Sequence, residues 1–229
     1  MLSIIIPVYN EEKTLQELLE KVYSLEFSGD RELVVVDDGS TDGSKKIAQK
    51  FTEGKKDVKL VSKKNGGKGT AIRAGLENAS GEIITIQDAD LEYNPEDLVK
   101  MYQALIQHGK GTAIYGSRFR RKHNYQWAIP VHYVGNRMLS LFTSILFGSS
   151  LTDMETCYKM FYKESLEGVK LKAKHFEIEP ELTAALLKRG VKIIEVPISY
   201  KPRSANQGKK ISWKDGVKAF FYLVKYRFS

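Results

Sequence analysis

Short apolar runs alternate with helix-like stretches over the first half of the chain. The runs have the length and composition of buried strands and cover residues 2–8, 32–36, 58–61, 83–86 and 112–115. Between them, apolar residues recur every three or four positions, as in helices with one buried face. This alternation predicts an α/β fold in which helices cover both faces of a mostly parallel sheet. Because such sheets bind ligands at the carboxyl ends of their strands, we look for chemistry there.

The helices expected in the second half carry broader apolar stripes. We expect helices over 131–147, 178–189 and from Trp213 to the C-terminus, and strands over 158–162 and 191–199. In the first half, Asn94 and Pro95 predict a helix with Asn94 as its N-cap and Pro95 as its first residue.

The helix over 131–147 and the C-terminal helix each pair an apolar stripe with basic neighbours. Such helices lie in a membrane interface, or they bury the stripe against the sheet as core. No apolar run approaches the roughly 18 residues of a membrane-spanning helix, and the first residues lack the features of a signal peptide. We therefore expect a protein that is soluble or lies on a membrane without crossing it.

The composition indicates one globular domain with a local excess of positive charge. With 229 residues, 42% of them apolar, the chain can form a normal core. Its net charge is +8, and the excess lies in the segments 117–137 and 209–229. Clustered positive charge predicts an anionic partner, such as phosphate, lipid headgroups or nucleic acid. The single cysteine, Cys157, excludes an intrachain disulfide and is expected to be a small buried residue.

Carboxylates follow three of the predicted strands: Glu11 after the first, Asp37 and Asp38 after the second, Asp88 and Asp90 after the fourth. Like charges this close repel one another. We therefore expect a divalent cation, Mg²⁺ or Mn²⁺, held by one or two carboxylates together with substrate phosphates. In a purely structural interpretation, the first aspartate pair caps a glycine-containing turn and the second forms a turn before the next helix.

A glycine-rich loop at 65–69 follows the third strand. Its glycines let the backbone approach a phosphate, and Lys68 within it can pair with a diphosphate. An ordinary turn with a solvated lysine is the alternative. The spacing matches neither a Walker loop nor a dinucleotide fingerprint, and the four histidines show no metal-ligand spacing.

Together these features resemble the family-two glycosyltransferases, which have the GT-A fold. The stretches that carry the resemblance are 6–12, 36–42, 65–69 and 87–90. Within that family the chain is most similar to dolichol- or polyprenyl-phosphate mannosyltransferases, through the stretches 116–118, 151–153, 177–181 and 196–203.

The resemblance covers nearly the whole chain and implies a single GT-A domain over 1–229. Residues 1–116 would form the nucleotide-sugar-binding half. Residues 117–229 would form the acceptor-binding half, which ends in a basic amphipathic helix.

The resemblance also implies roles for donor-side residues. The pocket for the nucleotide base and ribose would be lined by Pro7, Tyr9, Glu11 and Asp38. Asp88 would contact the ribose or the metal, and Asp90 the metal and the diphosphate. Glu92 stands where the lipid-phosphate enzymes have a metal-binding glutamine, and it can still bind a metal. Arg203 and Lys209 would meet the diphosphate as the C-terminal loop closes.

On the acceptor side, the resemblance implies that Arg118 holds the acceptor phosphate. Asp153 would act as a base or orienting group for a hydroxyl acceptor, or else simply cap a turn. The family's proline-serine-glycine stretch after threonine-aspartate is replaced here by residues 154–157. This departure leaves the identity of the acceptor open.

The expected reaction is a single displacement that inverts the anomeric carbon of a hexose. The metal would act as a Lewis acid on the leaving diphosphate, and Arg203 and Lys209 would add positive charge there. GDP-mannose is the first expected donor and a polyprenyl or dolichyl phosphate the expected acceptor, already anionic and in little need of a base. The enzyme would associate peripherally with the cytoplasmic face of an anionic membrane.

Three alternatives remain open. The donor can be UDP-glucose, or the acceptor can be a soluble or cell-wall glycan. A module that only binds nucleic acid or lipid headgroups would fit the basic segments and their aromatic residues. However, such a module has no need of carboxylates at two strand ends, which repel phosphate without a metal, so a nucleic-acid partner is not expected.

Overall fold

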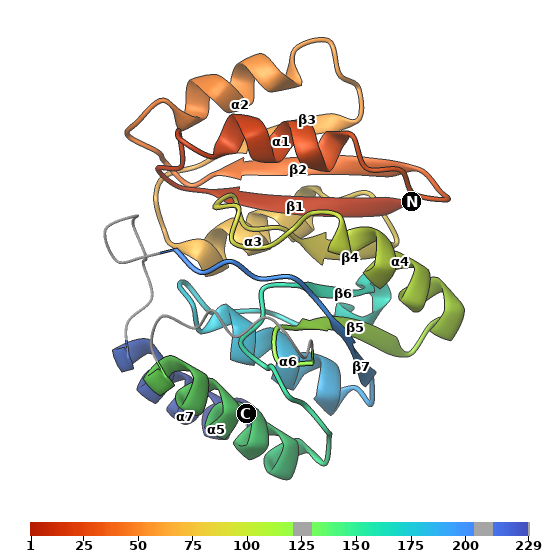
Figure 1. Cartoon of the computed structure of the whole chain (residues 1–229), viewed down its shortest axis with the longest axis vertical. Coiled ribbons are helices and arrows are strands. Elements are labelled where there is room, and N and C mark those ends of the chain that lie inside the picture. The colour runs from red at the N-terminus through yellow and green to blue at the C-terminus, as the bar shows by residue number, and fades with distance from the viewer. Residues whose placement is uncertain (121–129, 204–212, 229) are drawn as a thin grey trace.

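A seven-stranded sheet lies at the centre of the computed structural model, which describes residues 1–120, 130–203 and 213–228. The strands are β1 (Leu2–Val8), β2 (Arg31–Asp37), β3 (Val58–Ser62), β4 (Ile83–Ile86), β5 (Thr112–Ser117), β6 (Lys159–Tyr162) and β7 (Lys192–Pro197) (Figure 1). They lie in the order β3-β2-β1-β4-β6-β5-β7. Only β6 breaks the parallel arrangement, because it runs antiparallel to both β4 and β5. The predicted mostly parallel sheet is confirmed.

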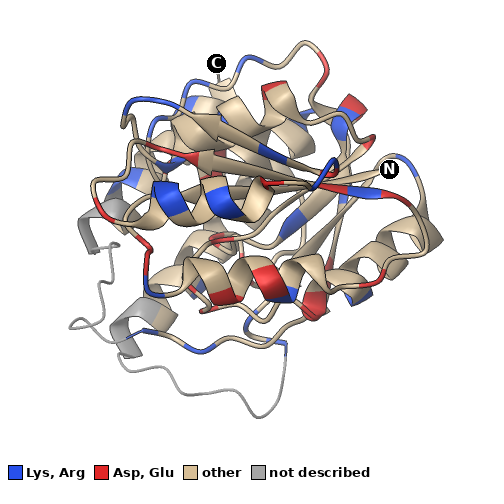
Figure 2. Cartoon of the chain, turned by 90° about the horizontal axis from the view of Figure 1, so that it is seen from above, with Lys and Arg blue, Asp and Glu red and all other residues tan. Residues whose placement is uncertain are grey.

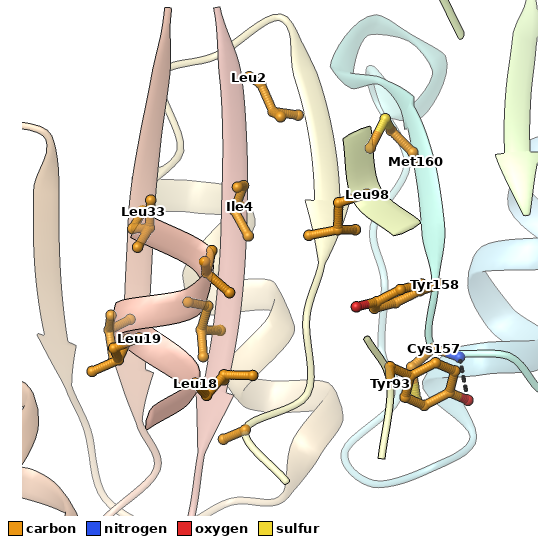
Figure 3. Packing of buried hydrophobic residues seen from close by; sticks show 14 of the residues in the cluster. Leu2, Ile4, Leu18, Leu19, Leu33, Tyr93, Leu98, Cys157, Tyr158 and Met160 are labelled. Atoms are coloured by element: carbon orange, nitrogen blue, oxygen red, sulfur yellow. Dashed lines mark hydrogen bonds between the residues drawn. The ribbon is translucent and has the colours of Figure 1, made fainter. Parts of the chain in front are cut away.

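Helices cover both faces of this sheet, as the alternating pattern predicts. One face carries α1 (Leu15–Tyr23), α2 (Ser44–Thr52) and α4 (Asp97–His108), and the other carries α3 (Lys68–Asn78) and α6 (Ile178–Lys188). Successive side chains of a strand point to opposite faces. Ile4 of β1 accordingly packs in the same cluster as Leu18 of α1 (Figure 3), whereas Ile5 packs in the cluster that contains Ile72 of α3.

Two further helices, α5 (Pro130–Phe147) and α7 (Trp213–Phe228), lie side by side next to α6 and away from β1–β3 (Figure 1). A third cluster of buried residues, which includes Leu139 and Leu223, joins them. Phe142 stacks on Phe220 with ring centroids 3.8 Å apart. The two helices therefore form a layer of their own at the β5–β7 side of the molecule.

Most of the apolar stripe predicted on α5 faces outward. The exposed fractions of Val134, Met138, Leu141 and Ile145 are 52%, 66%, 61% and 75%. On α7, Phe221 is also largely exposed. The interpretation that the whole stripe packs on the sheet as core is therefore wrong. In the described part of the chain, no helix combines the length and apolarity needed to span a bilayer.

The start of α4 differs from the prediction. It begins at Asp97 and not at Pro95, because the preceding residues form a tighter turn with bonds between residues three apart. The N–H of Asp97 donates to the oxygen of Asn94 at 3.1 Å, and the N–H of Leu98 donates to that of Pro95 at 3.0 Å. The Asn94 side chain accepts from the N–H of Glu96 at 3.3 Å, so it shapes the turn and not the helix itself.

Charged residues of both signs are spread over the elements seen in Figure 2. Four of the eleven basic residues in the segments 117–137 and 209–229 fall in 121–129 and 204–212, outside the described residues. The charged side chains of the candidate site are those that converge at the strand ends.

Candidate active site

A cavity of about 300 Å³ opens at the carboxyl ends of β1, β2 and β4. Ten of the residues singled out in the sequence line it: Pro7, Tyr9, Glu11, Asp38, Lys68, Asp88, Asp90, Glu92, Arg118 and Arg203. Asp153 is not among the lining residues, and Lys209 lies outside the described part of the chain. The volume of the cavity lies at the lower end of the usual range for small-molecule sites.

Asp38 shapes the glycine-rich loop at the β2 end of the cavity. Its carboxylate accepts the backbone N–H groups of Gly66 and Gly67, at 3.1 and 2.8 Å, and the ammonium of Lys63 at 2.5 Å. Gly67 has φ +93°, and a Cβ there would lie 2.2 Å from Nδ1 of His175. Only glycine fits this position. Asp38 therefore both caps a turn and faces the cavity.

Lys68, the first residue of α3, is a largely buried, ion-paired side chain and not a solvated one. Its ammonium lies 2.8 Å from Oδ1 of Asp88 and 3.2 Å from Oε1 of Glu179, and it donates to Sγ of Cys157 at 2.8 Å. Burial alone would lower the pKa of Lys68, but these neighbours, Asp88 first, raise it well above its ordinary value. Burial would likewise raise the pKa of Asp88, yet the Lys68 ammonium and the Cys157 thiol hold it below its ordinary value.

Arg203 pairs with three carboxylates of the cavity. Its guanidinium lies 2.9 Å from Glu11, 3.0 Å from Asp90 and 3.6 Å from Glu92. Glu92 also accepts the backbone N–H of Arg203 at 3.0 Å and the hydroxyl of Tyr200 at 2.6 Å. The segment that follows β7 is thereby fastened to the loop after β4.

Asp90 lies near more negative than positive charges. Burial, and next the charges of Asp88 and Glu92, raise its pKa to about 7, although Arg203 opposes the shift. The residue between the carboxylates, Leu91, has φ +59°, a left-handed conformation that a leucine rarely adopts. In this conformation Oδ1 of Asp90 accepts the N–H of Glu92 at 3.1 Å. Strained backbone of this kind is common where a side chain must be aimed at a ligand.

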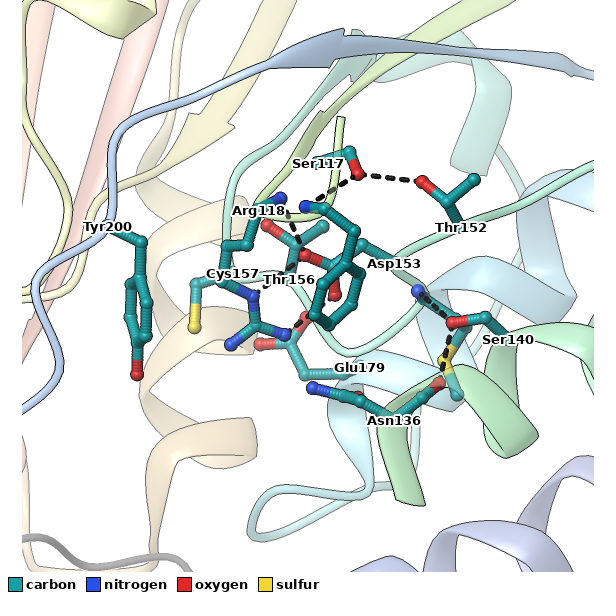
Figure 4. Close-up of polar contacts among 12 residues, drawn as sticks. Ser117, Arg118, Asn136, Ser140, Thr152, Asp153, Thr156, Cys157, Glu179 and Tyr200 are labelled. Carbon is teal, nitrogen blue, oxygen red and sulfur yellow. Dashed lines mark hydrogen bonds and ion pairs between the residues drawn. The ribbon is translucent and has the colours of Figure 1, made fainter. Parts of the chain in front are cut away.

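Arg118 and Asp153 form a buried pair at the β5 end of the cavity (Figure 4). The Asp153 carboxylate is fully buried and accepts the N–H, Nε and Nη2 of Arg118 at 2.9, 2.7 and 2.7 Å. Burial would lower the pKa of Arg118, but Asp153 holds it well above its ordinary value. Two-pronged pairs of this kind hold a guanidinium in one orientation.

The carboxylates expected to bind a metal, Asp88, Asp90 and Glu92, line one cavity but pair with Lys68 and Arg203. Within residues 1–120, 130–203 and 213–228, no three His, Cys, Asp or Glu side chains converge closely enough to hold an ion alone. The oxygen donors nevertheless suit Mg²⁺ or Mn²⁺ if substrate phosphates complete the shell. The excess of negative over positive charge around Asp90 is the observation that fits a cation.

Several cavity residues were not predicted as site residues: Tyr93, Glu155, Cys157, His175, Phe176 and Tyr200. Tyr93 packs between Tyr158 and Tyr200, with centroids 4.7 and 5.2 Å away, and its hydroxyl accepts the N–H of Cys157 at 3.3 Å (Figure 3). The departure from the family pattern at 154–157 was a usable signal for Glu155 and Cys157. His175 reaches the cavity by long-range packing against Gly67, for which the sequence carries no local signal.

The family model for glycosyl transferase family 2 matches residues 3–169, so this chain belongs to that family of enzymes. A UDP-N-acetylglucosamine–dolichyl-phosphate N-acetylglucosaminyltransferase of Methanococcus voltae is 28% identical over 98% of this chain and 95% of its own length. A dolichol-phosphate mannosyltransferase of Pyrococcus furiosus is 31% identical over 90% of this chain and 58% of its own length.

The chain has the GT-A fold that the sequence predicts. It resembles the crystal structure of glucosyl-3-phosphoglycerate synthase from Mycobacterium tuberculosis in complex with UDP, with a TM-score of 0.75. The match covers 99% of this chain and 80% of the synthase, at 20% identity. At that identity the likeness shows the fold and says nothing of the substrate.

Proposed function

We propose that this chain is an inverting glycosyltransferase that moves a hexose from a nucleotide sugar to a polyprenyl or dolichyl phosphate at a membrane surface. GDP-mannose is the first candidate donor, and a UDP-linked sugar such as UDP-glucose is the alternative. The relatives from M. voltae and P. furiosus, whose names state dolichyl-phosphate acceptors, support this acceptor class.

One observation carries the proposal: the cavity has a charged group suited to a phosphate at each end. Lys68 and Arg203 lie at the end formed by β1, β2 and β4, and Arg118 lies at the β5 end. A transferase with a phosphate-bearing acceptor must hold a leaving diphosphate and an attacking phosphate on opposite sides of the sugar. The three cations match this requirement.

The residues of the chain bind and orient the reactants. Lys68 and Arg203 place fixed positive charge where the diphosphate leaves, which favours the transition state. Arg118, held in one orientation by Asp153, binds the acceptor phosphate. An oxygen of that phosphate is already anionic and attacks the anomeric carbon in line without a general base, which inverts its configuration.

Asp90 would hold a divalent cation, with Asp88 or Glu92 and the donor phosphates completing its shell. When bound, Mg²⁺ or Mn²⁺ neutralises charge on the leaving diphosphate. Arg203, which pairs with Asp90 and Glu92 in this structure, exchanges these carboxylates for the diphosphate as the donor binds.

A soluble or cell-wall glycan acceptor is the weaker candidate. Its hydroxyl would need a base, and the sequence suggested Asp153 for that role. Asp153 is 0% exposed and accepts three hydrogen bonds from Arg118. We therefore propose that Asp153 positions Arg118 and does not remove a proton.

The exposed apolar faces of α5 and α7 support action at a membrane surface. The middle of α5 packs against the loop that holds Arg118: the hydroxyl of Ser140 accepts the N–H of Met154 at 2.9 Å (Figure 4). Arg137 donates to the oxygen of Thr152 at 3.1 Å. A lipid whose phosphate is bound at Arg118 would thus find apolar side chains close by. Helices with such faces lie in the headgroup region of a bilayer.

Calorimetry tests the donor. GDP-mannose, UDP-glucose and UDP-N-acetylglucosamine are titrated into the chain in the presence of Mn²⁺, and we expect GDP-mannose to bind most tightly. Preference for either UDP-sugar selects the alternative donor. Failure of all three to bind would sink the proposed activity.

Transfer of a radiolabelled sugar to a polyprenyl phosphate tests the acceptor and the metal together. We expect label in the lipid fraction, and loss of transfer in EDTA and in Asp90→Ala. Transfer that persists under either condition contradicts the metal role. Label that enters only a soluble glycan contradicts the lipid acceptor.

A further inference from the structure

Side chains hold the backbone of the loop between α5 and β6 at several residues, four of which lie between Leu151 and Met154. Glu195 of β7 accepts the N–H groups of Thr152 and Asp153, at 2.7 and 2.9 Å. Ser140 of α5 accepts the N–H of Met154, and Tyr93 accepts that of Cys157. A backbone tied at so many points has little freedom to move, so its side chains are fixed in the cavity wall.

This loop runs from one phosphate-binding end of the cavity to the other. Asp153 holds Arg118 at the proposed acceptor end, and Cys157 accepts from Lys68, at 2.8 Å, at the proposed donor end. Glu155 lies midway between them in the loop and lines the same cavity. In the proposed reaction the transferred sugar occupies the space between the leaving and attacking phosphates, so Glu155 lies beside that sugar.

Glu155 is the cavity-lining residue of this loop that has a buried polar atom without a partner. Its Oε1 is buried and has no hydrogen-bond partner among the described residues. A buried acceptor without a partner costs about 1–3 kcal/mol, and natural proteins rarely keep one unless a ligand or water satisfies it. The other polar side chains between Thr152 and Cys157 are hydrogen-bonded.

We propose that Glu155 recognises the donor sugar by accepting a hydrogen bond from one of its hydroxyl groups. A hydroxyl is the group that fits: it donates a hydrogen bond, whereas an ionised carboxylate repels the phosphates on either side. The inference rests on the proposed function, because it places a sugar between the two phosphate sites. The inference assigns the choice among hexoses to a residue that has no role in the reaction proposed above.

The difference in affinity between a nucleotide sugar and its parent nucleotide tests this role. Calorimetry is run on wild type, Glu155→Gln and Glu155→Leu with GDP, GDP-mannose, UDP, UDP-glucose and UDP-N-acetylglucosamine. Glu155→Leu should bind the preferred nucleotide sugar about tenfold or more weakly, the usual loss for a hydrogen bond to a charged group. Binding of the parent nucleotide should not change. Glu155→Gln keeps an acceptor oxygen of the same shape and should lose less.

Glu167→Gln is the matched control, because Glu167 is exposed and lies in the turn after the 3₁₀ helix Lys163–Leu166, away from the cavity. It should leave both affinities unchanged. Thermal melting of every variant checks the fold, and we expect Glu155→Leu to melt no lower than wild type because it removes an unsatisfied buried carboxyl.

The outcomes separate this inference from the proposed function. Equal affinity of wild type and Glu155→Leu for the nucleotide sugar overturns the inference alone. So does an equal loss for nucleotide and nucleotide sugar, or a fall in kcat with unchanged donor affinity, which would indicate a base. Wild type that binds no sugar nucleotide in the panel overturns the proposed function and this inference with it.

Discussion

Carboxyl groups in and beside this cavity are costly to bury in the charged form, and their surroundings compensate that charge to different degrees. Asp88 and Asp153 each have a cation in direct contact, at 2.8 and 2.7 Å. Asp90 and Glu155 are less well compensated, and the pKa of each is raised to about 7. Asp90 pairs with Arg203 at 3.0 Å but also lies near Asp88 and Glu92. We assign ligands to these two groups with raised pKa, a cation to Asp90 and a sugar hydroxyl to Glu155.

The raised pKa of Glu155 predicts how stability depends on pH. Burial is its main cause; Glu179 and Asp153 add to it, while Lys159 and Arg118 oppose it. Between the ordinary glutamate pKa of 4.5 and about 7, the folded chain keeps a proton that the unfolded chain releases. Stability from this group is therefore lost as pH rises through that window.

Glu155→Gln should remove this dependence. Relative to wild type, the variant should gain on the order of 2 kcal/mol of unfolding free energy at pH 8 and little at pH 5. Urea denaturation at the two pH values measures the difference, and comparison with wild type cancels the contribution of Asp90. An equal gain at both pH values would show that Glu155 does not titrate in this range.

The pair of Arg118 and Asp153 predicts non-additive effects of substitution. Arg118→Ala leaves a fully buried carboxylate without its cation, which costs about 3–5 kcal/mol. Asp153→Ala leaves the guanidinium unpaired and should also destabilise. The double variant should lose clearly less than the sum of the two, because neither charge is then stranded.

Transfer activity separates the structural role of this pair from its functional role. If Arg118 binds the acceptor phosphate, the double variant recovers stability but not transfer, and its KM for a polyprenyl phosphate stays high. Recovery of transfer together with stability would show that Arg118 serves the fold alone.

Among the elements, those set by local pattern could be predicted from the sequence. The strand at Ile83–Ile86 has the predicted bounds, because an apolar run between polar turns defines both its ends. The start of α4 was misplaced because Asn94 and Pro95 fit a turn as well as a cap, and only the packing of the helix decides. The reversal of β6 also has no local signal, since direction depends on which neighbours a strand meets.

The residues of the site likewise divide into those with a local sequence signal and those brought together by packing. Carboxylates that directly follow strands, such as Asp38 and Asp88, could be predicted to share a cavity, because parallel strands end at one edge. Their partners could not be predicted. Lys68 is paired with Asp88 through the packing of α3. Arg203 reaches Glu11 from a segment 192 positions away in the chain.

The loop that precedes α3 allows a test of how closely Gly67 is packed. Gly67→Ala places a Cβ 2.2 Å from Nδ1 of His175 and 2.5 Å from the backbone oxygen of Lys174. Gly54→Ala is the matched control, because Gly54 has φ +73° but nothing within 4 Å of its would-be Cβ. The control should lose about 1–2 kcal/mol from backbone strain alone.

Gly67→Ala should lose more stability than Gly54→Ala and should also bind the nucleotide sugar more weakly. The second effect follows because Gly67 lines the cavity and donates its N–H to Asp38 at 2.8 Å. Urea denaturation and donor calorimetry measure the two effects. Equal losses for both variants would mean that the loop can move away from His175.

At the scale of the whole molecule, the proposed donor site and the exposed apolar faces lie on different parts of the fold. The cavity opens at the strand ends, whereas α5 and α7 form a layer beside α6, on the β5–β7 side (Figure 1). The loop around Arg118 and Asp153 joins the two. For the proposed activity, this arrangement would let one surface rest on a bilayer while the nucleotide sugar enters from water.

The apolar face of α5 therefore predicts membrane binding that depends on named side chains. Met138→Ser together with Ile145→Ser should abolish most co-sedimentation with vesicles that contain anionic lipid, because inserting one such side chain contributes about 1.5–3 kcal/mol. Both side chains are more than 60% exposed, so the variant should melt no lower than wild type. Ile106→Ser is the matched control, since Ile106 is exposed on α4, and it should sediment like wild type. Wild type that stays in solution at low salt, or a control that loses as much binding as the α5 variant, would contradict this orientation on the membrane.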